Sequence, residues 1–285
     1  MDPDRTLDRD VDALLAGRAY VVEGAGAVDV GGADAIRWLH DLLAADVASL
    51  RPGEARRSLL LSPTGRIRAD VVVVRTPSGA TLLQPSDQPD RVVDLLARYV
   101  LSSDVELGTE RAMRVVRCPG APVDVAGLDG GPVPAAPSSL GGGLDLVAPD
   151  DAALEGARRA AARDGRIEVG TAAADAARVV LGDARLGVDV EPGDLPGGTP
   201  LDRTIAYAKG CFLGQESVAR VRNLGHPPVA VRGARVDGRA APGDEVLAGD
   251  GAPPGRVTSV APDPEGGTAL IVRLPWAAVD RAWRL

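Results

Sequence analysis

The order of hydrophobic and polar positions divides the chain into short strands and a few amphipathic helices. Apolar residues recur every three to four positions over 33–44 and 90–99, and helix-capping signals bound 151–164, so a helix is predicted in each segment. Alternating or continuous apolar runs predict strands at 18–23, 27–30, 56–62, 67–74, 81–84, 102–107, 113–117 and 144–147. Because short turns join most of these strands, we expect antiparallel sheets and an α+β fold.

The segment Gly24-Ala25-Gly26 separates the first two predicted strands. A Gly-x-Gly pair begins the dinucleotide-binding fingerprint, but the third glycine is missing and residues 28–30 continue as a strand. We therefore interpret the segment as a hairpin turn.

After Pro227 and Pro228 the pattern changes to strands alone. Short runs at 229–236, 245–247, 255–260 and 268–274 are separated by Pro- and Gly-containing turns. This spacing predicts a small antiparallel β-barrel. We therefore divide the chain into residues 1–228 and a C-terminal β-barrel domain of residues 229–285.

Composition narrows the classes of function. The 285 residues are 45% hydrophobic, and a net charge of −8 argues against nucleic acid as a main partner. The two cysteines fit no zinc or haem spacing, so no metal site is expected. The acidic N-terminus does not resemble a signal peptide, and no apolar run is long enough to span a membrane. We expect a cytoplasmic monomer.

The segment from Lys209 to Arg220 carries the most distinctive chemistry. Lys209 is the only lysine and Phe212 the only phenylalanine of the chain, and Cys211 lies between them. A helix is predicted to start just after Gly214, and a helix N-terminus and a nearby lysine both favour the thiolate form of a cysteine. We expect a reactive Cys211; the alternative is a buried structural thiol in a glycine turn.

Two further side chains, Asp70 and Cys118, carry expectations of their own. Asp70 interrupts an apolar strand, and a half-buried carboxylate is a candidate for a functional site. We predict that Asp70 shares a cavity with the segment from Lys209 to Arg220. Cys118 ends a predicted strand, where a packed, unreactive thiol is expected.

The stretch Lys209-Gly-Cys-Phe-Leu-Gly-Gln-Glu216, with Val218-Ala219-Arg220 after it, resembles the signature of the YgfZ family. Members of this family are folate-binding relatives of the glycine-cleavage T protein, an aminomethyltransferase. Similar positions extend over nearly the whole chain: Val28–Asp34, Trp38-Leu39, Thr64–Asp70, Arg98–Leu101, Arg178, Gly182, Leu195-Pro196, Pro242-Gly243 and Gly255–Ser259.

The resemblance implies a fold, a ligand and partners. It implies two interlocked α/β halves with antiparallel sheets around a central folate channel, with a small barrel at the C-terminal end. The ligand would be tetrahydrofolate or another folate derivative. The role would be assembly or repair of iron–sulfur proteins, with links to tRNA modification and with iron–sulfur client or assembly proteins as partners.

The expected site residues follow from the motif and from Asp70. Cys211 and Lys209 are the expected catalytic residues. The expected folate-binding residues are Asp70, Gly210, Gly214, Gln215, Glu216 and Arg220.

Some positions depart from the family pattern. Leu42 and Ala44 stand where the family often has Gln and Thr, and Gly198 lies where a Glu is common. The transferase relatives carry paired acidic residues near Asp70, whereas position 69 is Ala. These departures weaken the expectation of folate binding and of a glycine-cleavage activity.

Three functions remain open at the level of sequence. The first is a folate-binding factor that serves iron–sulfur proteins through a reactive Cys211. The second is a folate-dependent aminomethyl or one-carbon transferase, for which Asp70 is the candidate acid or base. The third is an RNA-binding module that uses Arg220, Arg222, Arg232 and Arg235. The cysteine in the motif favours the first, because transfer to folate requires no thiol.

Overall fold

The computed structural model describes residues 3–101, 103–124, 135–138, 140–248, 254–280 and 283–284. Its helices are α1 (Pro3–Leu15), α2 (Ala35–Leu42), α3 (Val92–Ala97), α4 (Asp151–Arg163), α5 (Thr171–Val180) and α6 (Gln215–Leu224). Short 3-10 helices follow as η1 (Pro196–Gly198), η2 (Pro200–Thr204) and η3 (Trp276–Ala278).

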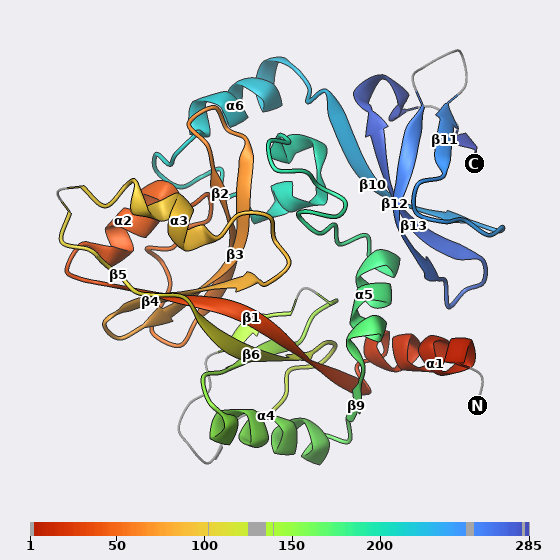
Figure 1. The fold of residues 1–285 in the computed structure, drawn as a ribbon, viewed down its shortest axis with the longest axis horizontal. Helices are drawn as coiled ribbons and strands as arrows, with labels where there is room; N and C mark the ends of the chain where they lie inside the picture. Colours follow the sequence, from red (N-terminus) through yellow and green to blue (C-terminus); the bar gives the residue numbers. More distant parts are fainter. Residues whose placement is uncertain are drawn as a thin grey trace.

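The larger sheet curls on itself to form a nearly closed barrel (Figure 1). Its main path runs β2-β3-β4-β1-β6-β8-β7, and the two end strands β2 and β7 approach each other. The strands are β1 (Ala19–Gly31), β2 (Ala55–Leu61), β3 (Ile67–Thr76), β4 (Gly79–Pro85), β5 (Glu106–Leu107), β6 (Arg111–Cys118), β7 (Ala135–Pro137), β8 (Leu144–Ala148) and β9 (Ile167–Val169). All pairings in this path are antiparallel, as the short turns predict.

The hairpin predicted at Gly24–Gly26 is wrong, because β1 runs without interruption through both glycines. These residues pair with Arg114, Met113 and Ala112 of β6. A Cβ on Gly26 would lie 3.1 Å from the carboxylate of Glu110. Gly26 therefore allows the Glu110 side chain to approach the backbone of β1 closely. It does not form the turn that the sequence predicted.

Two other predicted elements are shorter in the structure. The helix expected over 90–99 is α3, which covers only Val92–Ala97. Of the strand expected over 102–107, residue 102 lies outside the described residues, and within 103–107 only Glu106 and Leu107 form a strand, β5, which pairs with Val30 and Gly31 at the end of β1.

Helices cover the outer face of this sheet. Residues of α2 and α3 pack with alternate residues of β3, among them Ala69 and Val73, in one hydrophobic cluster. The helix α4 packs on β6 and β8 in a cluster that contains Cys118, so the packed thiol predicted there is confirmed. Burial raises the pKa of Cys118 to about 12.

The second sheet begins at Val229, where the sequence pattern changes. Its order is β10 (Val229–Val236), β13 (Thr268–Pro275), β12 (Gly255–Pro262), β11 (Glu245–Ala248) and β14 (Trp283–Arg284). The pairings are antiparallel, and β10 and β14 lie at the two edges of the order that the described residues form. That this second sheet closes into a barrel, and that residues 229–285 form a separate domain, remain predictions.

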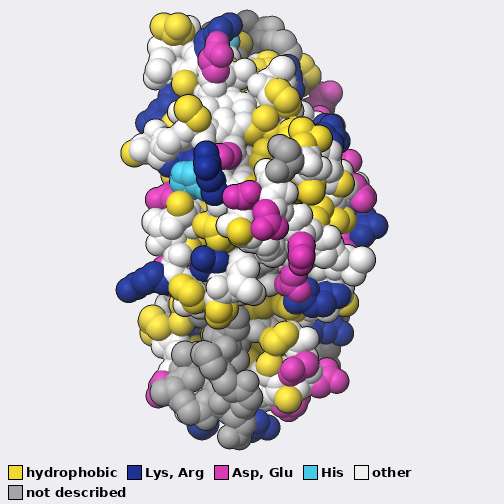
Figure 2. Space-filling view, turned by 90° about the vertical axis from the view of Figure 1, so that its left-hand side faces the viewer, with side chains coloured by type: hydrophobic (Ala, Val, Ile, Leu, Met, Phe, Trp, Pro, Cys, Tyr) yellow, Lys and Arg dark blue, Asp and Glu magenta, His cyan; other side chains and the backbone are white. Residues whose placement is uncertain are grey.

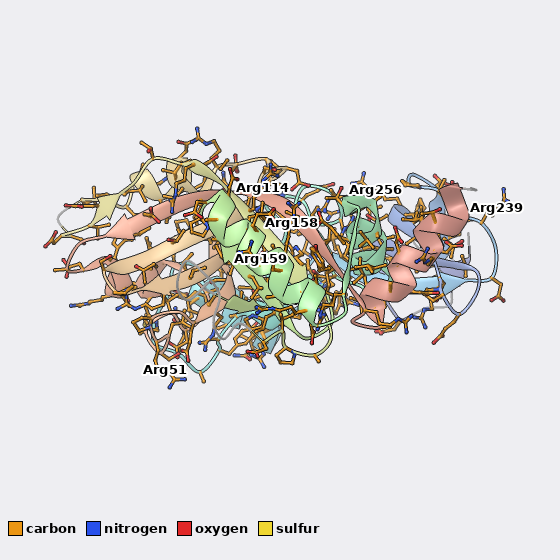
Figure 3. All side chains as sticks on the ribbon, turned by 90° about the horizontal axis from the view of Figure 1, so that it is seen from below. Arg51, Arg114, Arg158, Arg159, Arg239 and Arg256 are labelled. Carbon is orange, nitrogen blue, oxygen red and sulfur yellow. The ribbon has the colours of Figure 1, made fainter. Side chains whose placement is uncertain are left out.

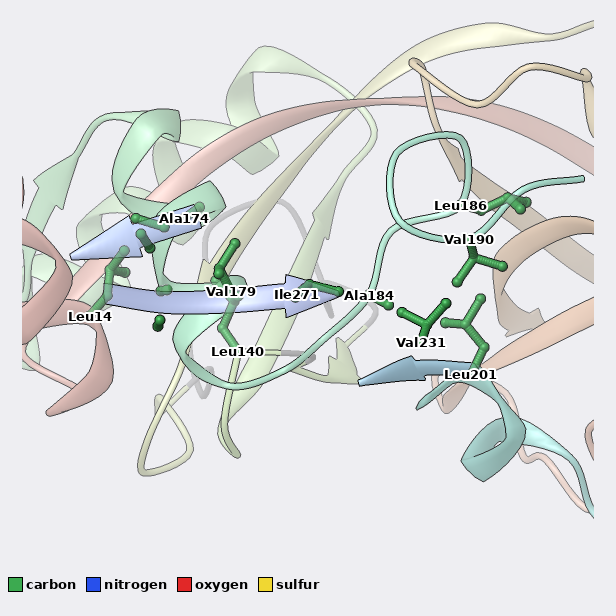
Figure 4. Close-up of a cluster of buried hydrophobic side chains, with 14 of the residues drawn as sticks. Leu14, Leu140, Ala174, Val179, Ala184, Leu186, Val190, Leu201, Val231 and Ile271 are labelled. Atoms are coloured by element: carbon green, nitrogen blue, oxygen red, sulfur yellow. The ribbon is translucent and has the colours of Figure 1, made fainter. Parts of the chain in front are cut away.

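A hydrophobic cluster joins the two sheets (Figure 4). It brings Leu14 of α1 and Val179 of α5 together with Val231 of β10 and Ile271 of β13. Each of these side chains is at most 2% exposed. At about 1.5–3 kcal/mol for each large apolar side chain that is fully buried, the contact is a major contribution to stability.

A buried polar cluster joins the same two parts. The Asp189 carboxylate is completely buried and accepts hydrogen bonds from Thr258 and Ser259 of β12, both at 2.6 Å. It also accepts from Arg178 of α5 at 2.7 Å and from the backbone N–H of Arg185 at 2.9 Å. Because every acceptor position has a donor, the cluster fixes α5 against β12.

Candidate functional site

The interior of the barrel holds a cavity of about 330 Å³. Its apolar lining comes from inward-facing residues of five strands: Val72, Leu83, Val115, Ala136 and Val147. Charged residues of β1, β2, β3, β6 and β8 line it as well: Glu23, Arg57, Asp70, Arg117 and Asp145. A volume in the usual range for small-molecule sites, with few polar groups on an apolar wall, is typical of a ligand pocket.

Asp70 lies on β3 and is 6% exposed, so the half-buried carboxylate that its sequence position predicts is buried further than expected. Arg57, on the neighbouring strand β2, donates to Asp70 Oδ1 from Nε at 3.0 Å and to Oδ2 from Nη2 at 2.6 Å. The same guanidinium donates from Nη1 to both oxygens of Asp183, at 2.9 and 3.1 Å. Burial alone would lower the pKa of Arg57, but the two carboxylates together raise it.

Asp145 lies on β8 and is also 6% exposed. Its Oδ2 accepts from Arg117 Nη1 at 3.1 Å, and Arg117 pairs as well with Glu23. Its Oδ1 is buried and accepts no hydrogen bond of good geometry from the described residues, although the Ser138 side chain lies close enough to lower the pKa of Asp145. Burial raises the pKa of Asp145, and Arg117 is the strongest opposing influence. A buried acceptor without a donor is costly, so this oxygen marks a position where a ligand group would bind.

The segment from Lys209 to Arg220 forms a loop that runs into α6, as its sequence predicts. Gly214 has a φ of 81° and lies directly before the helix. The Gln215 side chain accepts a hydrogen bond from the backbone N–H of Phe212 at 3.2 Å. Glu216 and Arg220 form an exposed ion pair at 3.1 Å.

The Lys209 amine binds the backbone and not the neighbouring thiol. Its Nζ donates to the carbonyl oxygens of Leu43 at 2.6 Å and Ala45 at 3.0 Å, and also to that of His40. These carbonyls belong to the last turn of α2 and the residues after it, where a cation is favourable. Burial lowers the pKa of Lys209 to about 8. Cys211 is exposed to solvent, and so is Gly210.

The prediction that Asp70 shares a cavity with this segment is wrong. As the described residues define it, the barrel cavity has no lining residue between 209 and 220. Successive side chains of a strand point to opposite faces, so Asp70 faces the interior while Ala69 faces α2 on the outside. Lys209 binds the end of α2, and Gly214 packs against Gly65, so the motif lies at the β2–β3 turn, at the end of the sheet.

A second, smaller cavity of about 180 Å³ lies beside α6. Val218, Val221 and Arg222 of that helix line it, together with Tyr207 and Trp276. The guanidinium of Arg222 lies 3.7 Å from the centre of the Tyr207 ring.

Three charged residues of the barrel interior were missed at the level of sequence. Arg57, Arg117 and Asp145 each stand in a short apolar strand, which is the same signal that singled out Asp70. The signal was therefore present in the sequence. Only the pairing of strands distant in sequence shows that these four side chains face one interior.

The exposed arginines do not converge on one face. Arg51 and Arg239 lie near opposite ends of the molecule, and Arg114, Arg158, Arg159 and Arg256 are spread between them (Figure 3). On the face shown in Figure 2, basic and acidic side chains are interspersed. The four arginines of the RNA-binding hypothesis have partners within the chain: Arg220 and Arg235 pair with acidic side chains, Arg222 lies over the Tyr207 ring, and Arg232 donates to the carbonyl of Gly198. These contacts lend the hypothesis no support.

No helix in the described parts of the chain combines the length and the apolar character that a membrane span requires. Within the same residues, no group of three or more His, Cys, Asp or Glu side chains is arranged to hold a metal ion.

The fold places the chain in a class. It superimposes on the crystal structure of the glycine cleavage system aminomethyltransferase T from Bartonella henselae with a TM-score of 0.74, at 20% identity. The match covers 94% of this chain and 82% of that one. The molecule therefore has the fold of that transferase, with a barrel-like sheet and a smaller second sheet.

Sequence comparison then identifies the family. The chain is 30% identical over 250 residues to a probable aminomethyltransferase of Halobacterium salinarum, covering 74% of this chain and 68% of the relative. It is 28% identical over 268 residues to an aminomethyltransferase of Frankia alni, covering 84% and 73%. No protein-family model matches. The chain belongs to the aminomethyltransferase family.

Proposed function

We propose that the chain binds a reduced folate inside the barrel and that its reaction class is folate-dependent aminomethyl or one-carbon transfer. The observation that carries the proposal is the buried, unpartnered Oδ1 of Asp145 in a cavity of about 330 Å³. Membership of the aminomethyltransferase family supports it.

The residues of the cavity fit such a ligand. A pterin ring is flat and carries adjacent N–H groups on one edge, which match the acceptor oxygen of Asp145. The apolar side chains of Leu83, Val115 and Val147 offer a surface for the face of the ring. Asp70 lines the same cavity, so its assignment as a folate-binding residue is retained as part of the proposal.

The other predicted folate-binding residues do not belong to this cavity. Gly210, Gly214, Gln215, Glu216 and Arg220 lie on the segment outside the barrel, away from the lining of this cavity. A role for them in binding folate stays a prediction that the cavity does not support.

The test is a titration with tetrahydrofolate under anaerobic conditions, followed by calorimetry. We expect saturable binding by the native chain, and binding at least about ten-fold weaker for Asp145→Asn, because the amide replaces an acceptor oxygen. Asp90→Asn is the matched control, since Asp90 is half-exposed and pairs with Arg68 outside the cavity. Absence of binding by the native chain, or equal affinity in Asp145→Asn, would refute the proposal.

A second candidate function is the YgfZ-like role in assembly or repair of iron–sulfur proteins. It is favoured by the exposed thiol of Cys211 on a loop that Lys209 holds to the end of α2. Partners would supply the cluster, since the described residues form no set of metal ligands.

This role is tested in cells that lack the native gene. We expect cells with the Cys211→Ser variant to have lower activity of iron–sulfur enzymes than cells with the native chain. Protein levels should be equal, because Cys211 is exposed. Equal enzyme activity in the two strains would remove the thiol from the proposal.

A further inference from the structure

Arg57 occupies both oxygens of the carboxylate that is the candidate acid or base. Nε donates to Asp70 Oδ1 and Oδ2 at 3.0 and 3.1 Å, and Nη2 donates to Oδ2 at 2.6 Å. This is the bidentate geometry that makes arginine–carboxylate pairs strong and directional.

Further contacts keep Arg57 in this position. Its Nη1 donates to both oxygens of Asp183, and Asp183 is also paired with Arg203. Arg57 itself lies on β2 and pairs through its backbone register with Val72 of β3, so the strand cannot shift without breaking the sheet. The guanidinium is therefore held from two sides, and releasing Asp70 requires that Asp183 release it as well or that the side chain rotate.

Asp145 provides the contrast within the same cavity. Both carboxylates are 6% exposed, yet one has each oxygen hydrogen-bonded and the other has a free Oδ1. Four carboxylates and three guanidiniums meet in this part of the wall: Glu23, Asp70, Asp145, Asp183, Arg57, Arg117 and Arg203. Among the buried carboxylate oxygens described in this wall, Asp145 Oδ1 is the one without a well-formed hydrogen bond.

The arrangement matters for transfer chemistry. A folate supplies a nucleophilic amine, and bonding a carbon group to that amine displaces its proton, which a base must accept. A general base must reach that proton with a lone pair that is not already engaged. Arg57 engages the lone pairs of Asp70 that face it, so only the lone pairs on the far sides of the two oxygens stay free to accept a proton.

We propose that Arg57 is a positioning residue that sequesters Asp70, so that this chain holds its folate without using Asp70 as the proton acceptor for transfer. The identity of the ligand rests on the proposed function, but the sequestration of Asp70 does not. Arg57 thereby separates binding, which depends on Asp145, from the rate of transfer, which is slow in the native chain and rises when Asp70 is released.

The first experiment tests sequestration without any folate. The carboxyl groups are labelled with a water-soluble carbodiimide and glycine ethyl ester, and labelling is read residue by residue by mass spectrometry. In the native chain we expect Asp145 to be labelled and Asp70 to be protected at least ten-fold relative to it. Arg57→Leu should raise labelling of Asp70 at least ten-fold, and Arg57→Lys, which keeps the charge without the bidentate fork, should give an intermediate value.

Arg203→Leu is the matched control. It removes the second partner of Asp183 but leaves the contact between Arg57 and Asp70, so labelling of Asp70 should stay within two-fold of the native value. Circular dichroism establishes that each variant is folded, and Arg57→Lys decides the question should Arg57→Leu fail to fold. Native labelling of Asp70 equal to that of Asp145, or labelling unchanged by the Arg57 substitutions, would overturn the proposal.

The second experiment measures turnover. With tetrahydrofolate and an aminomethyl donor, Arg57→Leu should increase the rate of transfer at least ten-fold over the native chain. Arg57→Leu combined with Asp70→Asn should lose this gain. A loss of structure does not raise activity, so a gain is specific to the proposal. A rate in Arg57→Leu at or below the native rate would contradict it.

The outcomes distinguish a failure of the proposed function from a failure of the role proposed for Arg57. A native chain that does not bind tetrahydrofolate removes the proposed function, while the labelling result still decides whether Arg57 sequesters Asp70. Folate binding with unprotected Asp70 retains the proposed function and removes the role of Arg57.

Discussion

Replacing Asp189 with Asn tests the buried polar cluster between α5 and β12. The carboxylate of Asp189 accepts four hydrogen bonds, two of them from Thr258 and Ser259 and one from Arg178. Asn keeps the shape of the side chain but loses its charge. Its amide group also places a donor where the native carboxylate presents an acceptor to another donor.

The magnitude follows from the burial of the charge that remains. Removing one partner of a buried ion pair costs about 3–5 kcal/mol, because the other charge stays buried without compensation. Arg178 keeps one carboxylate partner, Asp175, and a hydrogen bond to Ser259, so we expect Asp189→Asn to lower the free energy of unfolding by about 3 kcal/mol, at the lower end of this range. Asp175→Asn is the control: Asp175 contacts the same guanidinium at 2.7 Å but is half-exposed, so its loss should cost less than about 1 kcal/mol.

The assay is unfolding in urea, followed by the fluorescence of variants that retain a single tryptophan. Trp38 lies on α2 beside the first sheet, and Trp276 lies directly after β13 of the second. In the native background the two signals should change together. In Asp189→Asn the Trp276 signal should change at lower urea, because the second sheet has lost its polar attachment. A stability loss no larger than that of Asp175→Asn, with coincident transitions, would refute the reasoning.

Three other predictions concern the segment outside the barrel. Iodoacetamide near neutral pH should label Cys211 at least about ten-fold faster than Cys118, which is buried with a pKa raised to about 12, and residue-resolved mass spectrometry measures both. Burial lowers the pKa of Lys209 to about 8, below its ordinary value of 10.5, so between these values the unfolded chain binds a proton that the folded chain does not. The free energy of unfolding of the native chain should therefore rise relative to Lys209→Met between pH 8 and 10, by about 1 kcal/mol after allowance for partial exposure, in urea titrations at each pH. Gly214→Ala should cost about 2–3 kcal/mol in thermal unfolding, because φ is 81° and a Cβ would collide with the backbone of the β2–β3 turn, whereas Gly210→Ala has open space and should cost less than about 1 kcal/mol.

The elements that sequence analysis predicted well are those defined by local rules. The alternation of residues 56–62 and 67–74 predicted β2 and β3, and the change after Pro228 predicted the start of the second sheet. Gly214 marked the start of α6, since a left-handed residue before a helix favours glycine. Each of these signals depends on neighbours within a few positions.

What sequence analysis missed depends on pairing between distant segments. Lys209 was expected to act on the adjacent Cys211, but its amine reaches carbonyls of residues 40–45. Asp70 was expected to face the motif, but the direction of a side chain from a strand follows from which face the rest of the sheet buries. Arg57 and Asp145 can be recognised as site residues only in the folded structure, because the curled sheet directs side chains of β2 and β8 into one interior.

The position of β1 has a consequence for how the molecule is made. This strand is the first of the chain, yet its partners are β4, β5, β6 and, last of all, β9 at Ile167–Val169. Pairings this distant in sequence slow folding, because a long loop must close before any contact rewards it. At a synthesis rate of about 5–20 residues per second, roughly 10–30 s pass before β9 exists to meet β1. During that interval the edge of β1 at Ala19–Val21 stays unpaired, and an unpaired edge can pair with another chain.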